Sequence, residues 1–324
     1  MGLPSVVSFL KEMLEENHTQ AKAKWSRIRM LVNNVILGTS LLFLLYIIYK
    51  NWGQLQTYLK YLNYWLLVLT LLLYPLGFLP LLMMWHKIMS YVRGCTNFYT
   101  NIRLYSLSCL PKRLPGTIWY ISSRVALYHE YQVKPATTLI ATFIETICLT
   151  LSGFSIFLLS MLVGTTHALL FQLKGMVICL FLLPLAFLIG ILVAGRGSWS
   201  QEHKSLITNN FDLRDALLLL GISALAWTGG GLLLYILSNA VTRLPVTQLP
   251  SLIGIWSGTG ALSLSVGLFT QGLGLREMAL TALLSHIMPL PAAAIVSILF
   301  RLLLIVGESI WALVAAWLAH KVAK

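Results

Sequence analysis

Apolar residues occur in several long runs along this chain, separated by shorter polar segments. An α-helix needs about 20 such residues to cross the hydrocarbon core of a bilayer. Runs of this kind are found at about 31–49, 62–84, 136–162, 172–195, 215–239 and 291–319. The pattern predicts an all-α integral membrane protein with about six full spans. Four aromatic residues near the ends of the second run are expected to anchor it at the membrane interface: Tyr61, Tyr64, Trp65 and Trp85.

Two further apolar regions, 95–130 and 251–286, are each divided into pieces too short to span. The first is interrupted by PKRLPG at 111–116 and the second by a glycine-rich stretch around GLG at 272–274. Non-helical backbone at membrane depth is tolerated where it is buried in protein or lines a water-filled cavity. Each region is therefore interpreted as a re-entrant pair of half-helices. A pair of helices lying on the membrane surface is the alternative.

The order of these elements repeats along the chain. A shift of 156 positions places Gly116 on Gly272 and Glu145 on Arg301. Three of the predicted spans separate the two broken regions, so the second region must enter the membrane from the opposite side. We therefore predict an inverted repeat, with halves at about 62–163 and 215–320. Many transporters are built in this way, with a binding site near the bilayer midplane.

Composition and charge agree with a membrane protein. Hydrophobic residues make up 58% of the chain and charged residues 10%, whereas a soluble domain carries about 25% charged residues. The net charge of +13 is assigned to Lys and Arg collected in cytoplasmic loops, where they also attract anionic lipid, and not to nucleic-acid binding. We expect both termini to be cytoplasmic, in the cell (inner or plasma) membrane. Residues 1–30 would form a basic amphipathic segment that is not a cleaved signal peptide, and 31–324 a single polytopic membrane domain.

No cofactor or metal site is predicted. The four cysteines form no CxxC pair and have no histidine at a zinc-binding spacing, so they are interpreted as small apolar fillers. GLGLRE at 272–277 lacks the third glycine and the βαβ context of a dinucleotide fingerprint. The chain also has no ATP-binding motif, and it is not expected to be an enzyme.

Six ionisable side chains stand inside apolar segments: Arg124, Glu145, Arg276, Glu277, Arg301 and Glu308. A charge at the centre of a bilayer costs on the order of 3 kcal/mol or more, so such residues pair with one another or line a polar cavity. Purely structural pairing that locks the helices together is one interpretation. Under it, Glu145 and Arg301 would pair with each other, because they occupy matching positions of the two halves.

A binding role is the other interpretation. Arg124 shares a helix face with Tyr120 and Tyr128, four residues to either side. Arg276 and Glu277 follow a glycine-rich break, where free backbone N–H groups and a guanidinium favour an anion such as a lipid phosphate. The candidate substrate-binding residues are Pro115, Gly116, Trp119, Tyr120, Arg124, Tyr128, Glu145, Gly272, Gly274, Arg276, Glu277 and Arg301.

The segments LPGTIWYISSR (114–124), followed by Glu145, and GLGLREMALTALL (272–284), followed by Arg301, resemble a known family. They are similar to the transmembrane flippase domain of the lysyl-phosphatidylglycerol synthase family and to stand-alone flippase-like membrane proteins. The resemblance covers roughly residues 30–320. It departs from the family at 271–272, where Gln-Gly stands in place of a frequent Pro-Gly. The resemblance implies a membrane domain that moves or accommodates a phospholipid or a lipid-linked sugar.

These observations lead us to expect a lipid translocase that moves an anionic phospholipid, an aminoacylated phospholipid or a lipid-linked sugar between leaflets. The arginines would hold the phosphate, the glutamates would position them or bind a cationic head group, and Trp119 and the two tyrosines would line the path. No synthase domain accompanies the membrane segments, so aminoacyl transfer is not expected. A lipid-modifying enzyme or a glycosyltransferase is a candidate partner. The alternatives are an integral-membrane transferase acting on a polyprenyl-phosphate-linked substrate, a non-catalytic partner of a lipid-synthesis enzyme, and a small-solute transporter.

Overall fold

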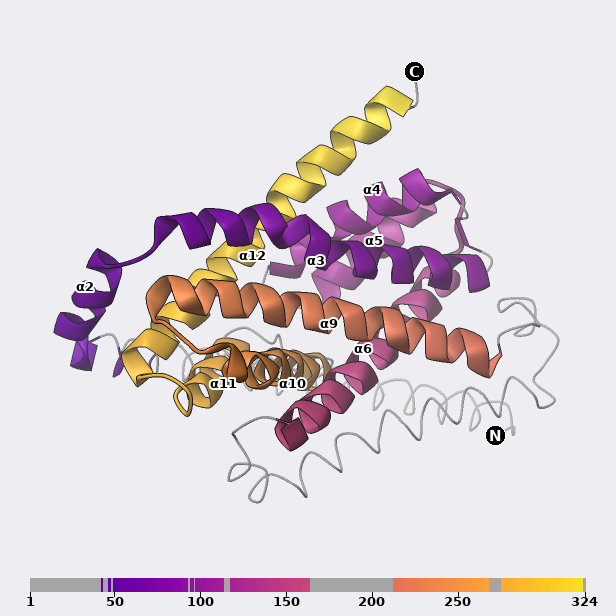
Figure 1. Ribbon diagram of the computed structural model, residues 1–324. Coiled ribbons are helices and arrows are strands. Elements are labelled where there is room, and N and C mark those ends of the chain that lie inside the picture. Colours follow the sequence, from indigo (N-terminus) through magenta and orange to yellow (C-terminus); the bar gives the residue numbers. More distant parts are fainter. Residues whose placement is uncertain are drawn as a thin grey trace, which may run out of the picture.

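The described part of the protein is built from helices. The computed structural model describes residues 42, 46–47, 49–92, 94–95, 97–113, 117–163, 212–267 and 275–322, and these ranges contain no strand. The helices are α2 (Trp52–Lys60), α3 (Tyr64–Tyr91), α4 (Phe98–Cys109), α5 (Thr117–His129), α6 (Pro135–Val163), α9 (Leu213–Val241), α10 (Leu249–Gly267), α11 (Leu275–Leu284) and α12 (Leu290–Val322) (Figure 1). Two 3-10 turns, η1 (Leu110–Arg113) and η2 (Val246–Gln248), precede α5 and α10.

Four of the long helices can cross a membrane. The segments that are long and apolar enough are Tyr64–Tyr91, Pro135–Ser160, Leu213–Val241 and Leu290–Trp317. An 18-residue window in each of them has a mean hydropathy between 1.8 and 2.3. They coincide with four of the predicted spans and confirm an all-α integral membrane protein. Most of the predicted span at 31–49, all of the span at 172–195 and the N-terminal segment 1–30 lie outside the described residues.

Short helices stand where the sequence predicts broken pairs. In the first region, α4 and η1 are followed by α5 after the break. In the second region, α10 and α11 flank the predicted glycine-rich break. The helix α10 has 19 residues, which makes it longer than the short piece that we predicted. Its internal glycines do not end it, because packing against neighbouring helices outweighs their low helix propensity.

Local sequence signals fix where these helices begin. The side chain of Asn63 caps α3 by accepting hydrogen bonds from the backbone N–H groups of Trp65 and Leu66. The side chain of Asn97 caps α4 in the same way, through the N–H of Thr100. Proline opens α6 at position 135, where its missing N–H and fixed φ are compatible with the first turn of a helix.

The helices α3 and α9 lie side by side across the middle of the molecule (Figure 1). Gly77 of α3 and Gly229 of α9 face each other in this contact. A Cβ atom added to Gly229 would lie 3.2 Å from the Cα atom of Gly77, so only glycine allows this approach without a shift. Small residues at such crossings let membrane helices pack backbone against backbone. At one end of the pair, the hydroxyl of Tyr91 donates a hydrogen bond to Asp215 Oδ1 at 2.8 Å.

Contacts also join the helices α3 to α6 with the helices α9 to α12. The helix α6 contacts α10 and α9, and the helix α12 contacts α4 and α3. Each short helix that follows a break also packs on the long helix after it, α5 on α6 and α11 on α12. This interleaving brings the ionisable side chains of α5 and α6 together at one place and those of α11 and α12 at another.

Candidate functional site

The first group of intramembrane charges is a sealed cluster around Arg124 in α5. Its guanidinium forms an ion pair with the carboxylate of Glu145 in α6, and the two side chains are 0% and 3% exposed. The guanidinium carbon lies 4.0 Å from the ring centre of Trp85, 4.6 Å from that of Tyr105 and 4.4 Å from that of Tyr120. Three aromatic faces therefore surround a cation that is excluded from solvent.

Hydrogen bonds add to the compensation of this ion pair, although the buried Nη2 atom of Arg124 has no hydrogen-bond partner. Arg124 Nε donates to Ser108 Oγ at 3.1 Å. The hydroxyl of Tyr105 donates to Glu145 Oε1 at 2.6 Å, and that of Tyr120 donates to Oε2 at 3.4 Å. A buried ion pair is tolerated when further hydrogen bonds satisfy its atoms. The cluster thus joins α3, α4, α5 and α6 through one neutral pair of charges.

A polar chain extends from this cluster through Tyr128. The indole N–H of Trp85 donates to the Tyr128 hydroxyl at 2.6 Å, which in turn donates to Asn101 Oδ1 at 2.9 Å. The amide nitrogen of Asn101 lies 3.0 Å from His86 Nδ1 and donates to the carbonyl of Cys95 at 2.7 Å. Tyr128 is itself 0% exposed, so its role in this structure is to tie α5 to α3 and α4.

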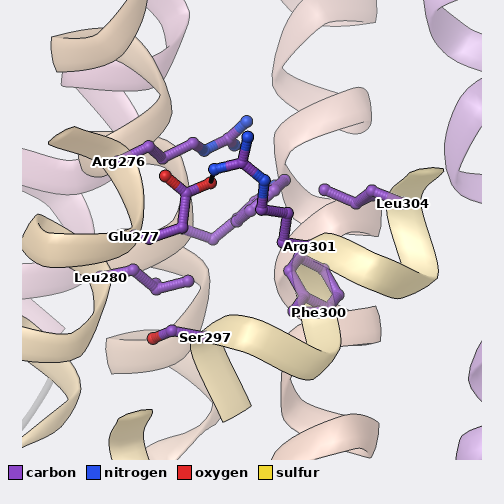
Figure 2. A pocket seen from close by; sticks show the side chains of 8 residues that line it. Arg276, Glu277, Leu280, Ser297, Phe300, Arg301 and Leu304 are labelled. Atoms are coloured by element: carbon purple, nitrogen blue, oxygen red, sulfur yellow. Dashed lines mark ion pairs between the residues drawn. The ribbon is translucent and has the colours of Figure 1, made fainter. Parts of the chain in front are cut away.

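The second group of charges lines a pocket between α10, α11 and α12. The guanidinium of Arg301 in α12 forms an ion pair with Glu277 Oε1 in α11 at 2.6 Å. Their side chains are 27% and 11% exposed, so this pair is more accessible than the sealed cluster. Figure 2 shows the charged ends of Arg276, Glu277 and Arg301 pointing toward one another from the two helices.

Arg276 is held over an aromatic ring at the edge of the same pocket. Its guanidinium carbon lies 3.8 Å from the ring centre of Trp256 in α10, and Trp256 packs edge-on against Phe300 at 4.7 Å. Next to it, a Cβ atom added to Gly260 would lie 2.2 Å from the ring of Trp227 and 3.1 Å from an Arg276 terminal nitrogen, so glycine leaves room for both side chains. The ring face of Trp256 stabilises the guanidinium at this place.

The pocket has charged and apolar walls. Its cavity is small, with a volume of about 20 Å³, which is room for about one water molecule. Its eight lining residues are Trp256, Arg276, Glu277, Leu280, Ser297, Phe300, Arg301 and Leu304. Arg276 and Glu277 stand in the first turn of α11, the end of a helix at which the macrodipole favours an anion. The two guanidinium groups favour an anionic group beside this recess, with apolar atoms on its other sides.

The acidic and the basic residue exchange places between the two groups of charges. In the first, the arginine is on the short helix α5 and the glutamate on α6; in the second, the glutamate is on the short helix α11 and the paired arginine on α12. Glu145 and Arg301 therefore do not pair with each other, although they occupy matching positions. The structural interpretation that paired them is wrong, because each has an oppositely charged partner on the neighbouring short helix.

The structure brings together some of the predicted site residues and separates others. Arg124, Tyr120 and Glu145 meet in the sealed cluster, and Arg276, Glu277 and Arg301 meet at the pocket. Trp119 is 58% exposed, so its indole lies on the outside of α5, away from both groups. Pro115, Gly116, Gly272 and Gly274 lie outside the described residues.

Sequence reasoning missed the aromatic residues that surround the arginines. Trp85 is 0% exposed and stacks on Arg124, so its predicted place at the membrane interface is wrong. The other three aromatic residues of that group, Tyr61, Tyr64 and Trp65, are exposed as expected. No local signal separates Trp85 from these three or predicts the place of Trp256, because their contacts with Arg124 and Arg276 join residues of separate helices.

Comparison with known proteins adds no relative: no protein-family model matches the chain, and no curated protein sequence matches it. The resemblance to the flippase domain rests on the quoted residues alone.

Proposed function

We propose that the protein translocates a lipid between the leaflets of the membrane and that the pocket between α10, α11 and α12 binds its phosphate head group. The observation that carries this proposal is the pocket itself. Two arginines and a glutamate face a recess whose other walls are apolar, inside a chain with four helices able to cross a bilayer. A lipid head group has matching properties, since an anionic phosphate is followed directly by apolar chains.

An inverted repeat is part of the same proposal, with six full spans, two re-entrant pairs and both termini in the cytoplasm. Under the shift of 156 positions, α3, α4, α5 and α6 correspond to α9, α10, α11 and α12. The packing supports this correspondence, because contacts of one set have counterparts in the other: α6 packs on α10 and α12 on α4, while α5 packs on α6 and α11 on α12. Binding sites of inverted-repeat transporters lie where broken helices meet, as α10 and α11 do here.

Within this proposal the two groups of charges have different roles. Arg276 and Arg301 bind the phosphate, and Glu277 orients Arg301 through the ion pair at 2.6 Å. Arg124 and Glu145, sealed by aromatic rings, hold the short helices of the first half against α6. Replacement at the pocket therefore removes transport while the protein stays folded, whereas replacement in the sealed cluster also removes stability.

Lipid flipping in proteoliposomes tests the proposal. Fluorescent lipids that carry different head groups are placed in both leaflets, and the fraction protected from a membrane-impermeant quencher is followed over time. We expect wild-type protein to move at least one phosphate-containing lipid. Arg276→Ala should slow this movement by roughly tenfold or more, because a hydrogen bond to a charged group contributes about 1.5–3 kcal/mol.

The matched control is Arg243→Ala, which removes an exposed arginine from the loop before α10. It should flip lipid at the wild-type rate. Both variants are compared by size-exclusion profile and thermal denaturation, so that a folding defect is seen separately. Two results contradict the proposal. One is that folded wild-type protein flips none of the lipids, and the other is that wild type and Arg276→Ala flip lipid at equal rates.

A further inference from the structure

The short helix α2 has an apolar face and a polar face. The spacing of Trp52, Leu55, Tyr58 and Leu59, at intervals of three and four residues, places these four side chains on one side of the helix. The opposite side carries small or polar residues, which are Gly53, Gln54, Thr57 and Lys60. A helix with two such faces lies at a boundary between an apolar and an aqueous phase.

The protein covers only half of the apolar face. Leu55 is buried in the core, and Tyr58 is half-buried against it. The other two side chains of this face, Trp52 and Leu59, are 57% and 45% exposed. Large apolar side chains that are left open beside one another favour an apolar covering.

The position of α2 indicates that this covering is lipid. The helix precedes α3, which is long and apolar enough to cross a bilayer, and it turns away from the line of α3 at the left end of Figure 1. Tyr64 and Trp65 are exposed at the start of α3, and an exposed apolar row continues from them through Leu69 and Leu72. Tyrosine and tryptophan gather at the level of lipid head groups. The exposed side chains of α2 therefore stand at the end of a lipid-facing surface.

Two lysines flank α2 in a stretch without acidic residues. Residues 46–65 include Lys50 and Lys60 but no Asp or Glu. The Lys50 ammonium lies 5.7 Å from the ring centre of Tyr46, and the Lys60 ammonium lies 6.0 Å from that of Tyr61. Such a contact holds a cation beside a ring without neutralising its charge. A lysine placed in this way keeps its alkyl stem on apolar surface and presents its charge to head groups.

We propose that α2 lies in the plane of the membrane interface and that Lys50 and Lys60 bind the head groups of anionic lipids there. Trp52 and Leu59 enter the acyl region, and Thr57 faces water. The charge of the two lysines favours this occupant over an apolar protein surface. The surface concentrates anionic lipid beside α3 and α12, the helix that α2 contacts. The inference goes beyond the proposed function and does not depend on lipid translocation.

A fluorescent reporter on a single cysteine tests the placement of α2. Leu59→Cys and Thr57→Cys are made in a background without the native cysteines, labelled with the same small fluorophore and reconstituted into bilayers. The two positions stand on opposite faces of one helix. Lipids with brominated acyl chains should quench the reporter at 59 more strongly than the reporter at 57. Iodide in the water should quench them in the opposite order.

Replacement of the lysines tests the role of charge. The ratio of quenching by brominated phosphatidylglycerol and by brominated phosphatidylcholine at position 59 gives the local preference for anionic lipid. We expect a preference of about fivefold or more with both lysines present, and of about one in the double variant Lys50→Gln/Lys60→Gln. Lys50→Arg/Lys60→Arg keeps the charge and should keep the preference. Lys134→Gln, which removes an exposed lysine before α6, is the control for a general loss of charge.

A second measurement uses protein that keeps its native cysteines, so that folding of the cysteine-free background does not decide the test. Phosphatidylglycerol added in detergent should raise the denaturation temperature of the wild type and of Lys134→Gln, because a ligand stabilises the state that binds it. The rise should be smaller for Lys50→Gln/Lys60→Gln.

Three outcomes overturn the inference. Equal quenching of both reporters by iodide would mean that α2 stands in water. Protection of the reporter at 59 from both quenchers would mean that protein, such as a second copy of the chain, covers this face. A preference for phosphatidylglycerol that is absent in the wild type, or unchanged in the glutamine variant, would remove the role of the lysines. Each of these results is obtained whether or not the protein moves lipid in vesicles.

Discussion

At the scale of single residues, the two arginines held over aromatic rings differ in what compensates them. Arg124 is fully buried, with Glu145 and Ser108 as polar partners and three rings around it. Arg276 lies over one ring and beside a pocket. The difference in burial predicts that the first residue matters chiefly for stability and the second for binding.

Replacement of Arg124 should therefore destabilise the protein. Arg124→Ala leaves the carboxylate of Glu145 buried without its cation, and breaking a buried ion pair in this way costs about 3–5 kcal/mol. We expect a clear fall in the denaturation temperature in detergent, with partial recovery when guanidinium at millimolar concentration refills the space between the rings. Arg124→Lys keeps the charge but not the planar group that stacks on the rings, so its stability should lie between that of the wild type and that of Arg124→Ala. An Arg124→Ala variant as stable as Arg243→Ala would show that the ion pair contributes nothing.

The sequence indicated these charged residues without indicating their partners. Apolar surroundings marked Arg124, Glu145, Arg276, Glu277 and Arg301 as residues that must pair or line a cavity. Pairing depends on how helices separated along the chain are placed, and spacing along one helix carries no such information. For this reason the equivalence of two positions suggested a wrong ion pair, and the aromatic partners were missed.

At the scale of elements, the crossing of α3 and α9 depends on the contact between two glycines. A Cβ atom on Gly229 would come within 3.2 Å of the Gly77 backbone, whereas a Cβ atom on Gly221, two turns earlier in the same helix, would have nothing within 4 Å. The two positions share a helix and a residue type and differ in what faces them. They form a matched pair for testing the crossing.

Gly229→Leu should lower stability and Gly221→Leu should not. Both changes raise helix propensity by up to about 1 kcal/mol, but only the first forces the helices apart, at an overpacking cost of about 1–3 kcal/mol. Thermal denaturation of the two variants in the same detergent measures the difference. Equal denaturation temperatures would mean that α3 and α9 can separate at this point without loss.

The elements themselves were largely accessible from the sequence. Apolar runs bounded by Asn63, Pro135 and Pro291 locate helices because length, capping and proline geometry act locally. The length of α10 was not accessible: the sequence predicted a short piece there, whereas the helix has 19 residues and packs against α6 and α9. Tertiary contacts decided that boundary, and they are not encoded in a local pattern.

At the scale of the whole molecule, the proposed inverted repeat makes a prediction about sidedness. The turn between α5 and α6 and the turn between α11 and α12 are counterparts, so they should face opposite sides of the membrane. Glu130 and His286 are exposed residues in these turns. Each can carry a single cysteine in a background from which the native ones are removed: Cys95, Cys109, Cys148 and Cys179.

Labelling with a membrane-impermeant thiol reagent gives the sides. In intact cells we expect His286→Cys to react and Glu130→Cys to react only after the membrane is opened. Detergent-solubilised protein provides the control, because both residues should then react at similar rates. Reaction of both cysteines from the same side would rule out an inverted arrangement of the two halves.

The pairing of opposite charges inside the helices also has an electrical consequence. An elementary charge that crosses the full membrane potential changes its energy by about 2.3 kcal/mol per 100 mV. The ion pair of Arg124 with Glu145 and that of Glu277 with Arg301 each have no net charge. The membrane voltage therefore exerts no net force on either pair, and a movement that keeps a pair together costs no electrical work.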